Sequence, residues 1–222
     1  MDEPVKRTRR YTSPHRVEQA AATRRQILDV AQRLFEEHGY VATSMAAIAA
    51  EAGVSLRTVY LGFASKPGLL IALWHLLLRG DEGPAPVGER SWFRAVLAKP
   101  DPSRQLRLNA RNARIVRQRA GRILRVIRDA AQADPELAAL WERIQAEFYE
   151  NQRAVVASLA EKGAMRPDLD EVRATDLLWT LNHPDLYGLL VDDRGWSADS
   201  YEAWLGDALC RELLAPPREP AT

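Results

Sequence analysis

The strongest constraint in this sequence is a pair of short helical segments separated by Gly53. Ser44 precedes the run 45–52 and Ser55 precedes the run 56–63, and a serine before an apolar run is a common helix N-cap. Gly53 supplies the backbone freedom that the turn between them needs. Small or branched apolar residues occupy the positions where the two helices would cross: Ile48, Ala49, Ala52, Val54 and Val59. The pattern predicts a helix-turn-helix, two short helices packed across a tight turn.

Helices are also predicted on both sides of this motif, which spans 44–63. Apolar residues recur at steps of three and four over 23–38, and Gly39 then ends that helix. Ser65 caps a further helix, whose leucines continue towards Gly80. The first part of the chain is therefore expected to be a three-helix head followed by a fourth, connecting helix.

The second helix of the motif is expected to present polar groups outward. Hydroxyl, phenol and guanidinium groups are those that reach DNA phosphates and base edges. The outward positions are Ser55, Leu56, Arg57, Thr58 and Tyr60. Charge supports this interpretation, because residues 1–80 hold eleven Lys/Arg against seven Asp/Glu although the whole chain has a formal charge of only +1.

The motif and its flanks resemble the N-terminal domain of the TetR family of regulators over 23–77. The matching stretches include Ile27-Leu-Asp-Val-Ala-Gln-Arg-Leu-Phe35, Gly39-Tyr-Val-Ala-Thr-Ser44, Ile48-Ala-Ala-Glu-Ala-Gly-Val-Ser55, Thr58-Val-Tyr60, Phe63 and Ser65-Lys66. The resemblance implies an all-α protein with a DNA-binding head, a connecting fourth helix and a larger C-terminal helical domain that dimerises and binds a small effector.

Carried onto this sequence, the resemblance implies DNA phosphate contacts from Ser44, Tyr60 and Lys66, with Thr43 assisting. The alternative for a serine such as Ser44 is that it caps its helix and does nothing more.

Arg57 is expected to read a base, because a guanidinium can bond bidentately to guanine O6 and N7. Leu56 or Thr58 would contact a thymine methyl group. The alternative for Arg57 is an ordinary solvated surface arginine.

Two glycines depart from the family pattern. Gly62 stands where the family often has histidine or another larger side chain, so a DNA contact usual there is either missing or made by the peptide itself. Gly68 stands where a helix former is usual, and we expect it to weaken the first turn of the fourth helix by up to about 1 kcal/mol relative to alanine.

Domain boundaries follow from composition. Residues 1–20 are expected to be a basic, flexible arm, 21–81 the DNA-binding domain, 82–215 the effector-binding and dimerisation domain, and 216–222 a tail. Glycine and proline residues over 83–88 indicate a linker. The longest apolar stretch covers ten residues, short of the roughly 20 that a membrane-crossing helix needs, so no membrane partner is expected and the cytoplasm is the expected compartment.

The second domain is expected to be helical throughout, with helices at 91–98, 103–118, 122–132, 135–162, 169–181, 184–192 and 199–214. Two amphipathic stripes near its end are expected to pair with a second copy of the chain as a homodimer. One stripe contains Leu177, Leu178, Leu181, Leu189 and Leu190, and the other contains Tyr201, Trp204, Leu205, Leu209 and Leu213.

Arginines recur at steps of three and four from Arg104 through Arg114, so they share one helical face. The run is extended by Arg117, Arg119, Arg122, Arg125 and Arg128. One interpretation is a solvated face paired with Asp129, Asp134, Glu142 and Glu147. The other is a pocket for an anionic effector, since an arginine leaves solvent only for a carboxylate or phosphate partner. The candidate effector residues are Arg111, Trp141, Phe148, Trp179, Asn182, His183 and Tyr187.

The sequence favours a ligand-responsive repressor that an effector releases from double-stranded, palindromic operator DNA. One alternative is a transcriptional activator of the same family. Another is a helical scaffold whose basic arm binds acidic partners, which sequence-selective binding to palindromic DNA would exclude. An enzyme is not expected, because the sequence has no nucleophile elbow, phosphate loop or paired metal-ligand motif. No cofactor is expected either, and His183 with Asp185 lacks a third ligand for a metal.

Overall fold

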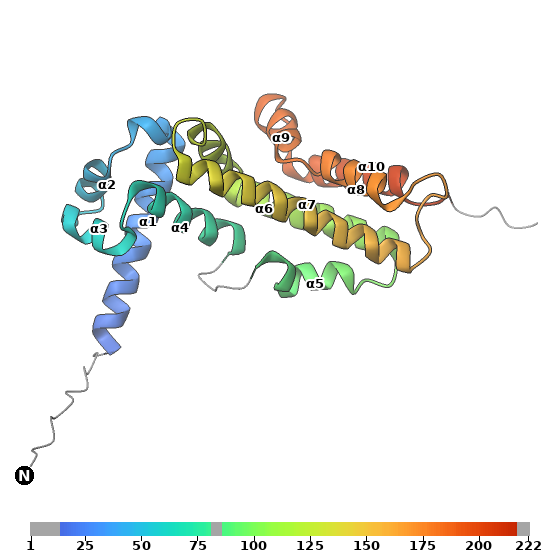
Figure 1. Ribbon diagram of the computed structural model, residues 1–222, viewed down its shortest axis with the longest axis horizontal. Coiled ribbons are helices and arrows are strands. Elements are labelled where there is room, and N and C mark those ends of the chain that lie inside the picture. Colours follow the sequence, from blue (N-terminus) through green and yellow to red (C-terminus); the bar gives the residue numbers. More distant parts are fainter. Residues whose placement is uncertain (1–13, 81–85, 217–222) are drawn as a thin grey trace, which may run out of the picture. The chain divides into compact units, whose positions relative to one another are not determined.

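The computed structural model describes residues 14–80 and 86–216, and these residues fold as helices (Figure 1). The chain divides into two compact units, Met1–Leu69 and Leu70–Thr222. The only β pairing in the described residues is an isolated bridge between Met165 and Leu214. The expected all-α fold, with a helix-turn-helix head and a larger helical second part, is confirmed.

The first unit contains α1 (Pro14–Ala42), α2 (Met45–Glu51) and α3 (Leu56–Phe63). Helix α1 begins nine residues before its predicted start, so 14–20, expected to belong to a flexible arm, are helical instead. The remainder of the expected arm lies outside the described residues. Gly39 does break α1 as predicted, with a φ of 77° that favours glycine.

The core of the first unit forms where the three helices meet. Phe35 from α1, Ile48 from α2 and Val59 from α3 are fully buried there. The apolar residues that predicted the helix-turn-helix therefore hold α3 firmly against its two neighbours.

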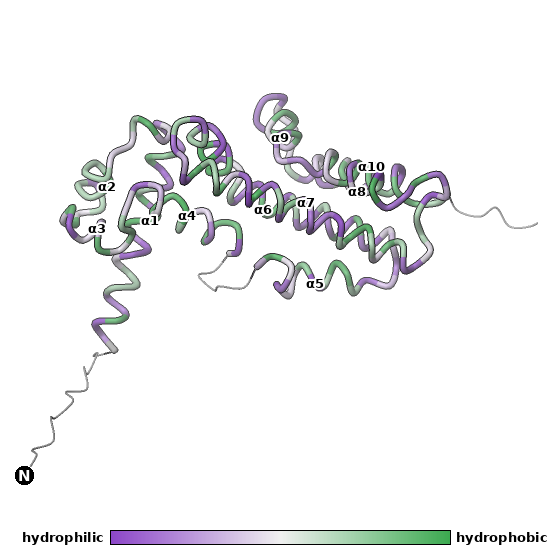
Figure 2. The backbone as a smooth tube through the Cα atoms, viewed as in Figure 1, coloured by the Kyte–Doolittle hydropathy of each residue, from purple (hydrophilic) through white to green (hydrophobic). Residues whose placement is uncertain are grey.

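Helix α4 (Lys66–Arg79) begins in the first unit and ends in the second. The second unit continues with η1 (Val87–Glu89), α5 (Ser91–Leu97), α6 (Pro102–Ala130), α7 (Pro135–Glu161), α8 (Glu171–Leu181), α9 (Pro184–Tyr187), the π-helical segment η2 (Gly188–Asp193) and α10 (Ala198–Leu213). Hydrophobic and hydrophilic residues alternate along the two long helices α6 and α7 (Figure 2).

Helix α6 is continuous over 102–130, whereas the sequence predicted two helices broken near Gly121. Gly121 does not end the helix, because an isolated glycine costs only about 1 kcal/mol in a helix interior. Packing outweighs that cost: Ile123, Leu124 and Ile127, which follow the glycine, are all buried.

Helix α10 packs along α6 and contributes to the core of its own chain. Tyr201, Leu205, Leu209 and Leu213 are fully buried among residues of α6, α7 and α8. The prediction that this stripe pairs with a second copy of the chain is therefore wrong for these four side chains, because they are already covered within the chain; Trp204, the fifth member, is half-buried.

No single helix in the described parts of the chain is long and apolar enough to cross a membrane. Helices α3 and α4 reach that length and composition only as a pair, and this pair is bent by 63°.

Candidate nucleic-acid interface and ligand cavity

Helix α3 separates an inward face from an outward face. Val59 and Phe63 are buried, whereas Leu56 and Tyr60 are 42% and 48% exposed and Arg57 is exposed beside them. Arg57 makes no hydrogen bond or ion pair with any described residue. The buried residues fix the helix in the core, and its other side presents a guanidinium, a phenol and a leucine to solvent.

The serines of the motif are helix caps. Ser44 Oγ accepts the N–H of Ala47 at 3.1 Å, and Ser55 Oγ accepts the N–H of Thr58 at 3.1 Å. The hydroxyls of Ser55 and Thr58 also bond to each other at 2.7 Å. A hydroxyl that accepts from an N–H keeps its own O–H as a donor. Capping and phosphate binding are therefore compatible at Ser44, which is exposed.

Thr43 does not belong to the DNA-contacting set in which the sequence placed it. Its side chain is only 3% exposed, and its hydroxyl donates to the carbonyl oxygens of Leu34 at 3.1 Å and Gly39 at 2.8 Å. These bonds satisfy carbonyl groups at the broken end of α1. Thr43 thus joins α1 to the start of α2 inside the head.

Lys66 lies in the first turn of α4, where the helix dipole disfavours a positive charge. An aromatic ring offsets this cost, because the ammonium nitrogen lies 4.1 Å from the ring centroid of Tyr40. Tyr40 in turn stacks on Phe35, with ring centroids 6.0 Å apart. The half-buried ammonium group is thus held at a defined place beside the motif.

Arg24 is a positioning residue that the sequence reasoning missed. Its guanidinium donates to the carbonyl of Gly62 at 2.9 Å and lies 4.3 Å from the ring centroid of Phe63. It therefore fastens the C-terminal end of α3 to α1. No local pattern indicates this contact, because the partners are 38 residues apart.

The turn between α3 and α4 changes the interpretation of Gly68. Ala64 has a φ of 61°, and the tight turn that follows brings the carbonyl oxygen of Phe63 against the Gly68 Cα. A Cβ at Gly68 would overlap that oxygen, whereas a Cβ at Gly62 would have open space. The expectation that alanine would strengthen the helix at Gly68 is wrong, because the site is closed by backbone.

The second unit holds a cavity of about 100 Å³ between the end of α4, η1, α5, α6, α7 and the α8–α9 junction. Its walls are mainly apolar and aromatic and include Trp74, Trp92, Phe93, Val116, Leu124, Ile144 and Phe148. Side-chain amides from Asn109, Asn112, Gln145, Asn151, Gln152 and Asn182 interrupt this lining, together with Arg117 and Glu147. An apolar enclosure with a few polar groups is the usual character of a small-molecule site.

The structure brings together part of the expected effector set. Phe148 and Asn182 line the cavity. Trp179 and His183 do not line it but lie beside Phe148, with ring centroids 6.5 and 6.4 Å from that of Phe148.

The other three expected effector residues lie elsewhere. Arg111 is exposed on α6, Trp141 is half-buried outside the cavity lining, and Tyr187 packs against Tyr201 in the core with ring centroids 4.9 Å apart. The sequence correctly predicted that aromatic and charged residues line the cavity. Which of them do so depends on the side of its helix from which each side chain projects.

Arg117, not Arg111, is the arginine of the cavity. Its side chain is only 8% exposed, one guanidinium nitrogen donates to the carbonyl of Asn182 at 2.9 Å, and the group lies 5.3 Å from the ring centroid of Phe148. Its Nε has no hydrogen-bond partner among the described residues. Burial lowers the pKa of Arg117 from its ordinary value because it penalises the charged form.

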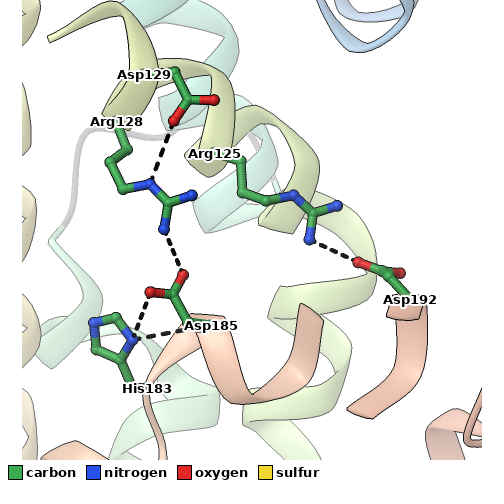
Figure 3. A network of polar contacts seen from close by, with 6 residues as sticks. All are labelled: Arg125, Arg128, Asp129, His183, Asp185 and Asp192. Carbon is green, nitrogen blue, oxygen red and sulfur yellow. Dashed lines mark hydrogen bonds and ion pairs between the residues drawn. The ribbon is translucent and has the colours of Figure 1, made fainter. Parts of the chain in front are cut away.

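Four of the eight other arginines of α6 form ion pairs with carboxylates. Arg107 meets Asp207 at 2.7 Å and Arg114 meets Glu202 at 2.5 Å. Figure 3 shows Arg125 directed at Asp192 and Arg128 between Asp129 and Asp185. The interpretation as a solvated, paired face holds for these four, and one of the expected carboxylates, Asp129, takes part in it.

His183 belongs to the same network and caps α9. Its Nδ1 accepts the N–H of Asp185 at 3.3 Å (Figure 3). Burial lowers the pKa of His183, although the nearby Asp185 carboxylate acts in the opposite direction. Within the described residues, no three potential metal ligands gather here or elsewhere.

Comparisons with known proteins agree with this architecture. The family profile described as "Bacterial regulatory proteins, tetR family" matches residues 27–73. The transcriptional regulator EthR of Mycolicibacterium smegmatis is 29% identical over 184 residues, covering 79% of this chain and 75% of its own.

Two solved structures share the fold. NalD, described as the secondary repressor of the MexAB-OprM multidrug efflux pump in Pseudomonas aeruginosa, has a TM-score of 0.67 at 24% identity and covers 89% of this chain and 98% of its own. A transcriptional regulator from Saccharomonospora viridis in complex with choline has a TM-score of 0.70 at 18% identity and covers 88% of this chain and 100% of its own.

Proposed function

Because the chain belongs to the tetR family of bacterial regulatory proteins, we propose that it is a transcriptional repressor that a small effector releases from its operator. As a member of that family it is a DNA-binding transcriptional regulator of the helix-turn-helix type. What we propose beyond this is that the protein represses transcription, that an effector releases it from the operator, and that particular residues perform these roles.

The outward face of α3 is the observation that carries the proposal. Arg57 stands exposed with no partner among the described residues, on a helix that contains no acidic residue and is anchored by buried Val59 and Phe63. A guanidinium so placed can bond to guanine O6 and N7 in the major groove. Leu56 beside it is suited to a thymine methyl group.

Groups around α3 would fix its position on the DNA backbone. Ser44 and Tyr60 offer exposed hydroxyls, and Lys66 offers a cation that the Tyr40 ring holds in place. Contacts of this kind carry no sequence information but set the register of the reading helix.

One head of this size contacts few base pairs, so a homodimer is part of the proposal. Two heads related by a two-fold axis would bind half-sites in successive major grooves, about 34 Å apart. The operator would then be palindromic, which matches the two-fold symmetry of the dimer.

Helix α4 supports a link between effector and operator. It carries Lys66 in its first turn, whereas Trp74 and Leu78 further along the helix line the cavity. A ligand that displaces Trp74 and Leu78 acts on the same helix that carries a proposed phosphate contact. Such a ligand weakens DNA binding to the extent that it binds the conformation unable to fit the operator more tightly than the conformation that fits it.

Selection of bound sequences from random double-stranded DNA tests the reading face. We expect the wild-type chain to enrich a palindrome. Arg57→Ala should relax selectivity at one base pair in each half-site, at a cost of about 1–3 kcal/mol for each. Arg94→Ala, which removes an exposed arginine from α5, is the matched control and should return the wild-type motif.

Two results would contradict the proposal at different points. Enrichment of no sequence at all would reject selective DNA binding. An unchanged motif with Arg57→Ala would remove Arg57 as the reader and leave the remaining assignment standing. Deletion of the gene should raise transcription from a promoter that carries the selected operator, and a fall would make the protein an activator.

A further inference from the structure

We propose that the cavity of the second unit binds a compact aromatic monocarboxylate, whose carboxylate pairs with Arg117. The inference rests on the proposed function only in making this ligand the effector. Binding itself concerns Arg117 and the cavity walls and can be measured without DNA.

Arg117 is the group that determines the chemistry of the ligand. Its guanidinium is more than nine-tenths buried and borders the cavity. An arginine stays charged in proteins, so the cavity wall carries a positive charge at any ordinary pH. A buried charge without a partner is expensive, and a charge-assisted bond to a carboxylate would offset that cost.

The protein's own contacts do not supply that partner. One guanidinium nitrogen binds the neutral carbonyl of Asn182, the Phe148 ring lies nearby, and Nε has no hydrogen-bond partner among the described residues. In contrast, Arg107 and Arg114 on the same helix each form an ion pair with a carboxylate. Arg117 therefore differs from its neighbours in both burial and pairing.

Glu147 lines the cavity but does not neutralise Arg117. It is exposed to solvent, and no ion pair joins it to Arg117. Two further titratable groups interact with Arg117. Burial raises the pKa of Tyr201 to about 12, so its phenol is neutral at physiological pH, and burial lowers the pKa of His183, which carries no negative charge in either form. The positive charge thus remains available to a ligand.

Neutral amides hold Arg117 and its carbonyl partner in place. The Asn182 side chain donates to Gln152 Oε1 at 3.1 Å, and the Gln152 amide donates to the Phe148 carbonyl at 3.2 Å. Asn182 Oδ1 and Asn109 Nδ2 are buried without partners, like Arg117 Nε, and both residues line the same cavity. Three residues of the cavity lining thus each carry a buried polar atom with no hydrogen-bond partner among the described residues, and this indicates a ligand with polar groups of its own.

The walls and volume restrict the rest of the ligand. Trp74, Trp92, Phe93 and Phe148 provide aromatic surfaces, which favour an apolar or aromatic body. A cavity of about 150 Å³ accommodates benzene, so the roughly 100 Å³ seen here limits the ligand to a single ring and has to widen by about half to hold it. A single arginine matches one carboxylate better than a phosphate dianion, which calls for more than one cation.

The experiment uses three probes of the same shape and different charge: benzoate, benzamide and benzamidine. Binding to the purified full-length chain is followed by calorimetry and by tryptophan fluorescence, since Trp74 and Trp92 line the cavity. We expect benzoate to bind more tightly than neutral benzamide, and cationic benzamidine to bind least. A charge-assisted bond corresponds to a difference of about 10- to 100-fold between benzoate and benzamide.

Variants then assign the effect to Arg117. Arg117→Met should remove the preference for benzoate over benzamide, and Arg117→Lys should retain part of it because the charge remains. Arg111→Met is the matched control: it removes an exposed arginine from the same helix and should leave the preference unchanged. Circular dichroism establishes that each variant is folded, and the comparison of probes on the wild-type chain stands without any variant.

The proposal is overturned if benzamide binds as tightly as benzoate, if none of the probes binds saturably at millimolar concentration, or if folded Arg117→Met keeps the preference. Release of the selected operator by benzoate is measured separately. If benzoate binds through Arg117 and the operator stays bound, the ligand class stands and the effector role in the proposed function fails.

Discussion

Gly62 and Gly68 are the same residue type on either side of one turn, yet they have different roles. A Cβ at Gly62 would point into open space, and the backbone there has no positive φ. A Cβ at Gly68 would meet the backbone oxygen of Phe63, which cannot move without disturbing the turn at Ala64. Only the second glycine is required by the fold.

Gly68→Ala should therefore destabilise the protein by about 1–2 kcal/mol, since overlap with backbone outweighs the helix propensity of alanine. Gly62→Ala is the matched control and should stabilise it by about 0.5–1 kcal/mol. Urea unfolding followed by circular dichroism measures both. Equal stabilisation by the two substitutions would show that the Phe63 carbonyl can move away from a Cβ at Gly68.

At the level of the element, α4 carries residues of both proposed sites, one at each end. Its first turn carries Lys66 against Tyr40, and Trp74 and Leu78 towards its other end line the cavity. A lysine at a helix N-terminus opposes the helix dipole, so its position there makes sense when phosphates lie nearby.

Lys66→Ala should weaken binding to all DNA sequences alike. The slope of log affinity against log salt concentration should fall by about two per dimer, because each protomer loses one phosphate contact. Fluorescence anisotropy with a labelled duplex over a series of salt concentrations provides the slope. Lys99→Ala, an exposed lysine between α5 and α6, is the control. An unchanged slope for Lys66→Ala would count against the phosphate contact.

At the level of the whole molecule, two partly buried histidines link stability to pH. Burial lowers the pKa of His75 below the ordinary 6.5, and Arg79 and Arg143 lower it further. Burial also lowers the pKa of His183. Both side chains therefore bind protons more readily in the unfolded chain than in the folded one.

The free energy of unfolding should be highest above pH 6.5 and fall as the pH drops from 6.5 through the lower pKa values of the folded state. The double variant His75→Gln/His183→Gln should show a shallower fall between about pH 6.5 and 5, above the range in which most carboxylates titrate. Thermal unfolding at a series of pH values measures this. An equally steep fall in the double variant would exclude these histidines as the cause.

Local patterns in the sequence were enough to predict most of the helices and to predict which side of α3 is exposed. Serine caps, glycine stops and apolar spacing act within a few residues, so α2, α3 and α7 lie close to their predicted bounds and Tyr60 is exposed as expected.

Only the tertiary structure decided which members of each residue type are buried. Arg111 and Arg117 cannot be distinguished by local pattern, but Asn182, 65 positions further along the chain, lies against Arg117 and encloses it. The α10 stripe was misassigned for the same reason. Thr43 and Gly68 were misassigned because of contacts with Leu34, Gly39 and Phe63, which the breaks at the ends of α1 and α3 bring close. Burial depends on which distant segments pack together, whereas a helix and its caps depend on hydrogen bonds between near neighbours.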